Sequence, residues 1–208
     1  MHIDKNFIPP FPYGKDNNKT SDAILIQNKD LIFFECKKRQ FHTLEFLKNG
    51  NGELFFERLK EFCFKPLNQI CGRIKDFRDG KFAIAGINKD TTIYPVVVFP
   101  SSPPFFSGAW DKFDFNKYVL PNYYKQDKKI ELPEFIDFSE LEYIEEYLRE
   151  NPGSNFVELI KMKRNDVAHH NSNWMVFLSK NNMVNKNKRL LEKYLGEVER
   201  FKNLLFEF

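Results

Sequence analysis

The sequence lacks the long apolar runs, paired cysteines and leader features that mark several classes of protein. In its 208 residues no stretch approaches the roughly 18 to 20 apolar residues that span a membrane. The three cysteines, Cys36, Cys63 and Cys71, include no CxxC pair, so neither a disulfide framework nor a zinc site is indicated. The first residues do not resemble a secretory signal, and we therefore expect a cytoplasmic protein with no membrane partner.

Charge of either sign is not in marked excess. The formal net charge is +3 and the isoelectric point is near 8.6, which suits a polyanionic partner without requiring one. The apolar share of 42% argues against global disorder, and the length allows one sizeable core with a helical appendage. Composition alone leaves the function open, so the motifs must decide it.

Two apolar runs joined by the polar turn 27–30 are the most informative part of the chain. If the loop has two or four residues, Ile26 pairs with Leu31, and counting outward places Asp22 opposite Glu35. A three-residue loop would slip the register and move these side chains to opposite faces. Directly opposed residues hold their Cβ atoms roughly 4.5 to 5.5 Å apart, where like charges repel each other.

A facing pair of carboxylates needs a compensating positive charge, which a divalent cation would supply. Mg²⁺ prefers oxygen ligands and is often held by one or two carboxylates together with substrate phosphate. Lys37 lies two residues beyond Glu35 and projects from the same face of the strand. The residues therefore predict two acids and one ammonium group around Mg²⁺ or Mn²⁺.

Asp22 followed by Glu35-Cys36-Lys37 resembles the PD-(D/E)xK superfamily of metal-dependent nucleases. The resemblance covers about residues 20–100 and implies catalytic roles for Asp22, Glu35 and Lys37. It also implies that the metal is bound by the two acids and the backbone carbonyl of Cys36. Lys37 would position or activate the attacking water.

The chain departs from this family in two ways. Ser21 stands where the family name places proline, and no amphipathic helix with a glutamate precedes Asp22. The proline-rich first twenty residues do not easily form such a helix. A catalytically inactive nuclease-like module that binds nucleic acid or protein is therefore an alternative.

The expected fold is α/β, with a restriction-endonuclease-like mixed central sheet flanked by helices. We expect an irregular N-terminal arm over 1–20 and a nuclease-like core over 21–135. This core includes a long loop rich in aromatic residues, which either pack on the core or stack on bases. Residues 136–208 are expected to form a helical segment that supports a homodimer or closes over the substrate.

Within the core, apolar spacing predicts a helix over 53–78, kinked or divided at Pro66 and ended by Asp79-Gly80. A short strand is expected over 81–87. The β-branched run 93–100 predicts a buried strand. This order of hairpin, helix and apolar strand is that of the nuclease core.

Substrate contacts are expected beside the hairpin. Lys38 and Arg39 are interpreted either as phosphate contacts or as a solvated strand end. Gln69, on the following helix, is a candidate substrate-facing residue. The resemblance implies nucleic acid as partner, with DNA favoured over RNA, and a role in defence or repair.

The C-terminal third suggests a second chemistry. Helices are expected from Ser139 to the break at 151–153, from Phe156 onward, and over 188–208. In the second of them, Arg164 and His169 resemble the Arg-x4-His motif of HEPN ribonucleases, which act without metal.

By that resemblance Arg164 and His169 would be catalytic. A histidine can move a proton near neutral pH, and an arginine can stabilise charge that develops on phosphorus. A metal-independent ribonuclease is therefore the alternative enzyme.

Overall fold

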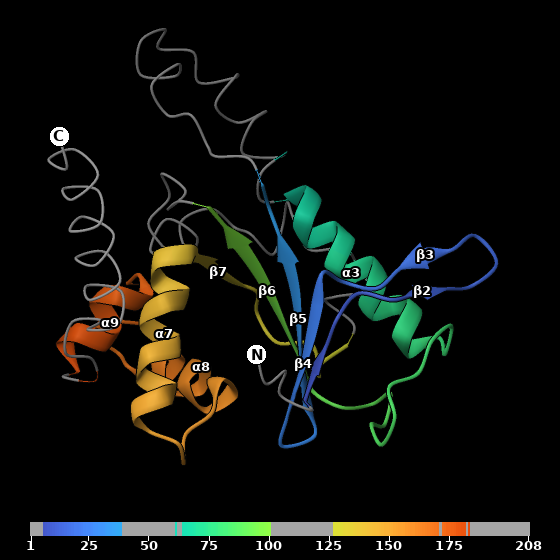
Figure 1. Cartoon of the computed structure of the whole chain (residues 1–208). Helices are drawn as coiled ribbons and strands as arrows, with labels where there is room; N and C mark the ends of the chain where they lie inside the picture. The colour runs from blue at the N-terminus through green and yellow to red at the C-terminus, as the bar shows by residue number, and fades with distance from the viewer. Residues whose placement is uncertain are drawn as a thin grey trace, which may run out of the picture.

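A mixed five-stranded sheet, in the order β1-β4-β5-β6-β7, forms the frame of the protein (Figure 1). The structure is a computed structural model that describes residues 6–38, 61, 64–100, 127–170, 172–181 and 183. Helices cover both faces of the sheet, which confirms the predicted α/β class with a mixed sheet flanked by helices.

The elements have the following bounds. The five strands of the main sheet are β1 (Phe7–Ile8), β4 (Ala23–Gln27), β5 (Asp30–Cys36), β6 (Ile93–Phe99) and β7 (Glu134–Asp137). A separate two-stranded sheet consists of β2 (Pro12–Tyr13) and β3 (Asn18–Lys19). The described helices are α3 (Lys65–Arg78), α7 (Phe138–Glu150), α8 (Phe156–Asn165) and α9 (Trp174–Lys180).

The β4–β5 hairpin has the predicted register. Ile26 pairs with Leu31, and a two-residue turn at Asn28 and Lys29 joins the strands. Both turn residues have positive φ, 52° and 72°, as in the turns whose twist matches that of paired strands. The turn therefore fixes which side chains of the two strands meet.

Strand β6 lies between β5 and β7 and is parallel to both. All of its residues are buried, which confirms the apolar strand predicted over 93–100. A parallel connection requires a crossover, and α3 lies in the one between β5 and β6. This topology brings α3 beside the strands that carry the hairpin's charged residues.

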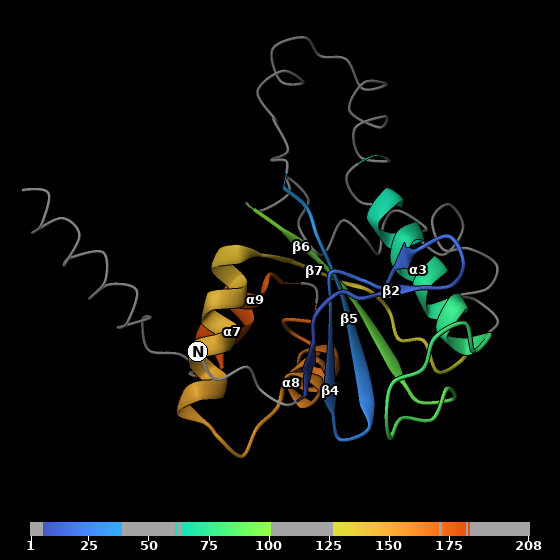
Figure 2. The ribbon, with the colours of Figure 1, turned by 45° about the vertical axis from the view of Figure 1, so that its right-hand side comes forward.

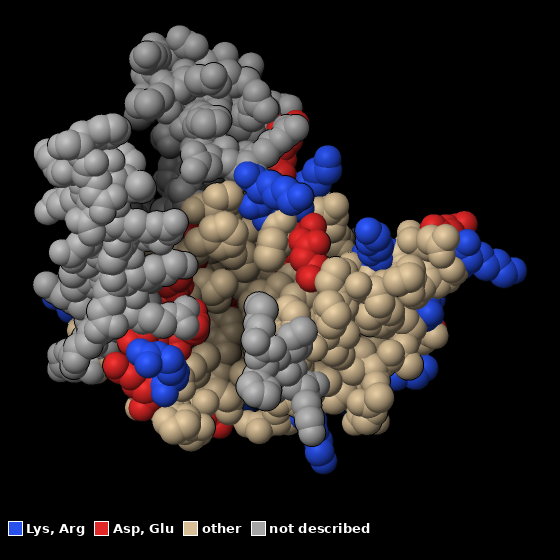
Figure 3. All heavy atoms as spheres, viewed as in Figure 1, with Lys and Arg blue, Asp and Glu red and all other residues tan. Residues whose placement is uncertain are grey.

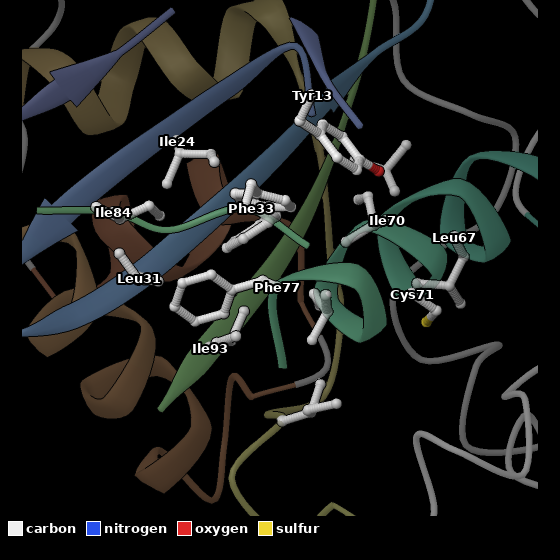
Figure 4. Packing of buried hydrophobic residues seen from close by; sticks show 14 of the residues in the cluster. Tyr13, Ile24, Leu31, Phe33, Leu67, Ile70, Cys71, Phe77, Ile84 and Ile93 are labelled. Atoms are coloured by element: carbon white, nitrogen blue, oxygen red, sulfur yellow. The ribbon is translucent and has the colours of Figure 1, made fainter. Parts of the chain in front are cut away.

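The alternation of side chains along β5 divides the core between the two faces (Figures 1 and 2). Leu31 and Phe33 pack with α3, as Figure 4 shows, whereas Ile32 packs with α7, α8 and α9. The buried residues of α3 recur at helical spacing and are Pro66, Leu67, Ile70, Cys71, Ile74 and Phe77. Two apolar layers therefore hold the sheet in place.

Pro66 lies in the first turn of α3, where its missing N–H leaves no helical hydrogen bond unmade. The described residues ahead of α3, Glu61 and Phe64, are π-helical, so the change from π-helix to α-helix falls beside Pro66, where the sequence predicts a kink or a division. Asp79 caps the helix and Gly80 follows with φ of 75°, which confirms the predicted end. Of the predicted helix over 53–78, residues 53–60, 62 and 63 lie outside the described part.

Two expectations near the sheet need correction. The segment 81–87 forms no strand; Phe82 and Ile84 are buried alternately, but they fill the α3 side of the core without joining a ladder. The arm over 1–20 is less irregular than predicted. Its described part supplies β1 to the edge of the sheet and folds β2 and β3 into a small hairpin.

The C-terminal helices also differ from expectation in detail. Asp137, not Ser139, caps α7, because its carboxylate accepts the N–H of Glu140 while Glu140 accepts the N–H of Asp137. The helix ends at Asn151 as predicted, and α8 begins at Phe156 as predicted.

Helix α9 was not expected from the sequence. The predicted helix over 188–208 and the aromatic loop over 101–126 lie outside the described residues. None of the described helices has the length and apolar character needed to cross a membrane.

Candidate functional site

Four predicted site residues meet at the carboxyl end of β5. Asp22 stands just before β4, Glu35 and Lys37 lie at the end of β5, and Gln69 projects from α3. We call these four residues the β5-end site. Acidic and basic side chains adjoin on the surface between the end of β5 and α3 (Figure 3).

The hairpin brings the two acids together. The last paired residues are Ala23 and Phe34, so Asp22 and Glu35 occupy the next position outward. The Oδ2 atom of Asp22 accepts the backbone N–H of Cys36 at 2.7 Å, which fixes its carboxylate against β5. The predicted register, which places Asp22 and Glu35 next to each other across the hairpin, is therefore confirmed.

Glu35 is largely withdrawn from water, with 13% of its side chain exposed. Burial raises the pKa of its carboxyl, and the charge of Asp22 acts in the same direction. The hydrogen bond from Lys37, 2.8 Å from Nζ to Oε1, opposes that rise. The carboxylate is therefore destabilised by its surroundings, and a further cation would stabilise it.

Lys37 links the sheet to α3. Its Nζ atom donates to Glu35 and, at 2.8 Å, to Oε1 of Gln69. The backbone N–H of Lys37 continues the pairing with β6 through the carbonyl of Val98 at 2.8 Å. Because side chains alternate along the strand, this pairing holds Lys37 on the face that carries Glu35.

The oxygen atoms of the site fit a hard divalent cation. Within the described residues, Asp22 Oδ1 and Glu35 Oε2 accept no hydrogen bond. The same residues contain no group of three or more His, Cys, Asp and Glu side chains suited to a metal. A metal here would use the two free carboxylate oxygens, and the carbonyl of Cys36, water and phosphate would complete its ligands, as Mg²⁺ often does.

Cys36 lies between Glu35 and Lys37 at the end of β5, so its side chain points to the opposite face of the strand. Burial and the charges of Asp22 and Glu35 raise its pKa to about 11. In the absence of a metal the thiol is therefore protonated near neutral pH and is a poor nucleophile. This agrees with the prediction that Cys36 contributes only its backbone.

The other predicted substrate contacts are divided between described and undescribed parts of the chain. Lys38 follows Lys37 directly and is exposed. Arg39 lies outside the described residues. The side chain of Gln69 is exposed, and its Oε1 atom accepts a hydrogen bond from the ammonium group of Lys37. Gln69 therefore positions Lys37.

Sequence reasoning missed two residues beside this site. Arg73 follows Gln69 by one turn of α3, and its NH1 donates to the hydroxyl of Tyr13 at 2.9 Å. That hydroxyl donates in turn to the carboxylate of Asp76. The i, i+4 spacing of Gln69 and Arg73 could have revealed the shared helix face, whereas nothing local points to Tyr13.

The second predicted motif has a different environment. Arg164 donates to Glu131 at 2.7 Å, to Glu134 at 3.1 Å and to the carbonyl of Leu132. Its guanidinium also lies over the ring of Tyr94, 5.8 Å from the centroid. The groups of this arginine that could bind a ligand are therefore occupied by the chain itself.

His169 lies outside the helix in which it was predicted, because α8 ends at Asn165. Its Nδ1 is 3.0 Å from Oδ2 of Asp166. A hydrogen bond from Asn181 and others from His169 and Ala168 lower the pKa of Asp166 to about 2. In the described part of the chain, Arg164 and His169 share no hydrogen-bond partner.

Two buried charges lie beneath this motif. Glu140 accepts the backbone N–H of Trp174 at 2.7 Å, and burial raises its pKa to about 7. Lys163 donates to the carbonyl of His170 at 2.8 Å and lies over the ring of Trp174 at 5.3 Å; burial lowers its pKa. We call Glu140, Lys163, Arg164 and His169 the helical charge cluster.

Comparisons with known proteins give no match: no family model, curated protein or solved structure is similar to this chain. The functional argument therefore depends on the geometry and chemistry of the two charged regions.

Proposed function

We propose that the chain is a metal-dependent nuclease that hydrolyses phosphodiester bonds at the β5-end site. The observation that carries this proposal is the convergence of Asp22, Glu35 and Lys37, with one carboxylate oxygen of each acid left free by the described part of the chain. In open α/β sheets, ligands bind outside the carboxyl ends of the strands, which is where these residues lie.

The topology supports the same proposal. An antiparallel hairpin is followed by a crossover helix and then by a strand parallel to the second hairpin strand. This order fits a restriction-endonuclease-like core and the resemblance to PD-(D/E)xK nucleases. The acid before β4 and the Glu-x-Lys at the end of β5 occupy the places that such a core requires.

The residues have separate roles in the proposed reaction. A Mg²⁺ or Mn²⁺ ion held by Asp22 and Glu35 would lower the pKa of a water and offset the charge of the scissile phosphate. An ammonium group has three donors, and Lys37 uses two of them on Glu35 and Gln69. Its third donor orients the attacking water or a phosphate oxygen.

The environment of Glu35 gives the reaction a pH dependence. Because burial raises the pKa of this carboxyl, protons compete with the cation for its oxygens at low pH. Cleavage is therefore expected to increase with pH until Glu35 is fully ionised. DNA is the proposed substrate, on the strength of the family resemblance.

The proposal is tested by cleavage of labelled plasmid, single-stranded DNA and RNA, each in Mg²⁺, Mn²⁺ or EDTA. Wild type is compared with Glu35→Ala and with the matched control Glu150→Ala, an exposed acid at the end of α7. We expect metal-dependent DNA cleavage in wild type and Glu150→Ala and none in Glu35→Ala.

Other results would overturn the proposal. RNA cleavage that survives both EDTA and Glu35→Ala would transfer the chemistry to Arg164 and His169. Nucleic-acid binding without cleavage under any condition would identify an inactive binding module.

A further inference from the structure

Arg73 has hydrogen-bonding capacity that the described protein does not use. A guanidinium carries five N–H donors. One of them reaches the hydroxyl of Tyr13 at 2.9 Å, and NH1 also lies 3.8 Å from the carboxylate of Asp76. Within the described residues, Nε and NH2 donate to nothing. The side chain is 30% exposed, so a ligand can reach it.

Two other arginines, Arg78 and Arg164, have more of their guanidinium nitrogen atoms hydrogen-bonded to the protein than Arg73 has. Arg78 uses Nε on Asp127 at 2.8 Å and NH2 on the carbonyl of Thr91 at 2.7 Å. Arg164 has acceptors on Nε, NH1 and NH2. Each of them is engaged on at least two nitrogen atoms, whereas Arg73 is engaged on one.

Arg73 lies beside the β5-end site. It follows Gln69 by one turn on the same face of α3, and Gln69 contacts Lys37 directly. Its positive charge is among those that favour the ionised form of Glu35, which places it within electrostatic reach of the proposed metal ligands. Gln69 and Arg73 thus present an amide and a guanidinium along the same side of the site.

The small hairpin of β2 and β3 orients Arg73. Tyr13, from β2, is buried and receives the NH1 donor, and its ring lies 5.8 Å below the guanidinium carbon. The Tyr13 hydroxyl donates to Asp76, which also accepts from Lys81 at 2.7 Å. Figures 1 and 2 show this hairpin beside α3. One edge of the guanidinium is fixed by these contacts, and its remaining donors stay free.

We propose that Arg73, oriented by Tyr13 and Asp76, binds a backbone phosphate of the substrate next to the bond that is cut. The planar fork of an arginine matches two oxygens of a phosphate, and such charge-assisted pairs are strong and directional. The inference rests on the proposed nuclease function and deepens it by assigning a phosphate-binding group outside the metal site.

The test is binding of a fluorescein-labelled DNA duplex in EDTA, followed by anisotropy over a series of KCl concentrations. Arg73→Ala is expected to weaken binding about tenfold and to reduce the salt slope by about one. The matched control is Lys75→Ala, which removes an exposed cation paired with Asp79 on the same helix. The control should keep the wild-type slope.

Two further variants separate phosphate binding from a loss of folding. Arg73→Lys keeps the charge but lacks the fork, so it should retain most of the salt slope and lose about threefold in affinity. Tyr13→Phe removes the hydroxyl that orients Arg73, and it should weaken binding by a similar factor. Circular dichroism and thermal melting establish that each variant is folded.

The outcomes distinguish this inference from the function on which it rests. If wild type binds and cuts DNA while folded Arg73→Ala and Arg73→Lys both keep the wild-type affinity and slope, Arg73 binds no phosphate. If wild type neither binds nor cuts nucleic acid, the proposed function fails, and the inference fails with it.

Discussion

The two charged regions of this protein differ in how completely the chain satisfies them. Among the residues that the structure describes, Asp22 and Glu35 in the β5-end site each keep an unused carboxylate oxygen, and Lys37 keeps an unused donor. In the helical charge cluster, Arg164 has acceptors on all three nitrogen atoms, and Glu140 accepts two backbone N–H groups.

This difference separates a site from a structural network. Both regions contain a short motif that resembles one found in nucleases, and the sequence favoured the hairpin motif over the Arg-x4-His motif. A charge whose partners are supplied by the fold has few atoms left for a ligand, whereas a charge with free atoms near the surface is able to bind one. The comparison favours the β5-end site over the helical charge cluster as the place of the proposed chemistry.

The largest expected effect is that of Asp22→Asn on metal-dependent cleavage. The substitution removes a ligand charge, but its amide oxygen can still accept the N–H of Cys36, so the hairpin should keep its shape. We expect a loss of roughly 1000-fold, about 4 kcal/mol in activation free energy. The matched change in the other region, His169→Ala, should alter the plasmid cleavage rate by less than about twofold. Equal losses in both variants would erase the distinction between the regions.

The next effect concerns the pH dependence of stability. The pKa of Glu140 is raised from 4.5 to about 7, so within this window the folded protein holds a proton that the unfolded chain has released. The free energy of unfolding should therefore fall by roughly 3 kcal/mol as the pH rises from 4.5 to 7.

Urea unfolding of wild type and Glu140→Gln across this range measures the effect. The variant cannot titrate, so its stability should change less with pH than that of wild type. Parallel pH profiles for the two proteins would show that another group is responsible.

A smaller effect is expected from Arg164→Ala. The substitution leaves the carboxylates of Glu131 and Glu134 without this cation and should lower the free energy of unfolding by about 2 kcal/mol. Cleavage per folded molecule should not change. Urea midpoints and cleavage rates, compared with those of the control Lys180→Ala at an exposed cation of α9, test both statements. A cleavage loss at full folding would return Arg164 to the catalytic candidates.

The smallest effect is that of Gln69→Ala. The variant frees Lys37 from one of its two partners, so the ammonium group should be less well positioned. We expect cleavage to fall about threefold, mainly in kcat, with stability unchanged. Asn68→Ala, at the exposed neighbouring position on α3, is the control. An equal loss in the control would remove Gln69 from the site.

Local patterns predicted the hairpin because everything needed to define it is close in sequence. The polar turn at Asn28 and Lys29 set the register, and the period of two then placed Glu35 and Lys37 on one face. The sequence also predicted the buried strand β6, because all of its positions are apolar or β-branched apart from Tyr94 and Pro95.

The position of Arg73 and the structure of the segment 81–87 could not be predicted from local sequence patterns. Arg73 depends on Tyr13, which is 60 residues away, and no local pattern encodes such a contact. Phe82 and Ile84 alternate with exposed residues as in a strand, yet they are buried in the core between the sheet and α3, where Phe82 packs on Phe77. Sequence periodicity indicates which side chains are buried, and only the tertiary structure shows what buries them.

The separations within the β5-end site also define an order of assembly. Asp22 contacts Cys36 across 14 residues, whereas Lys37 contacts Gln69 across 32. Short loops close at a lower entropic cost, and hairpins form in about 1 to 10 μs. We therefore expect the two carboxylates to meet before α3 docks, with their repulsion opposing the early pairing of the strands. Divalent cations should consequently speed the folding of this protein as well as support its proposed chemistry.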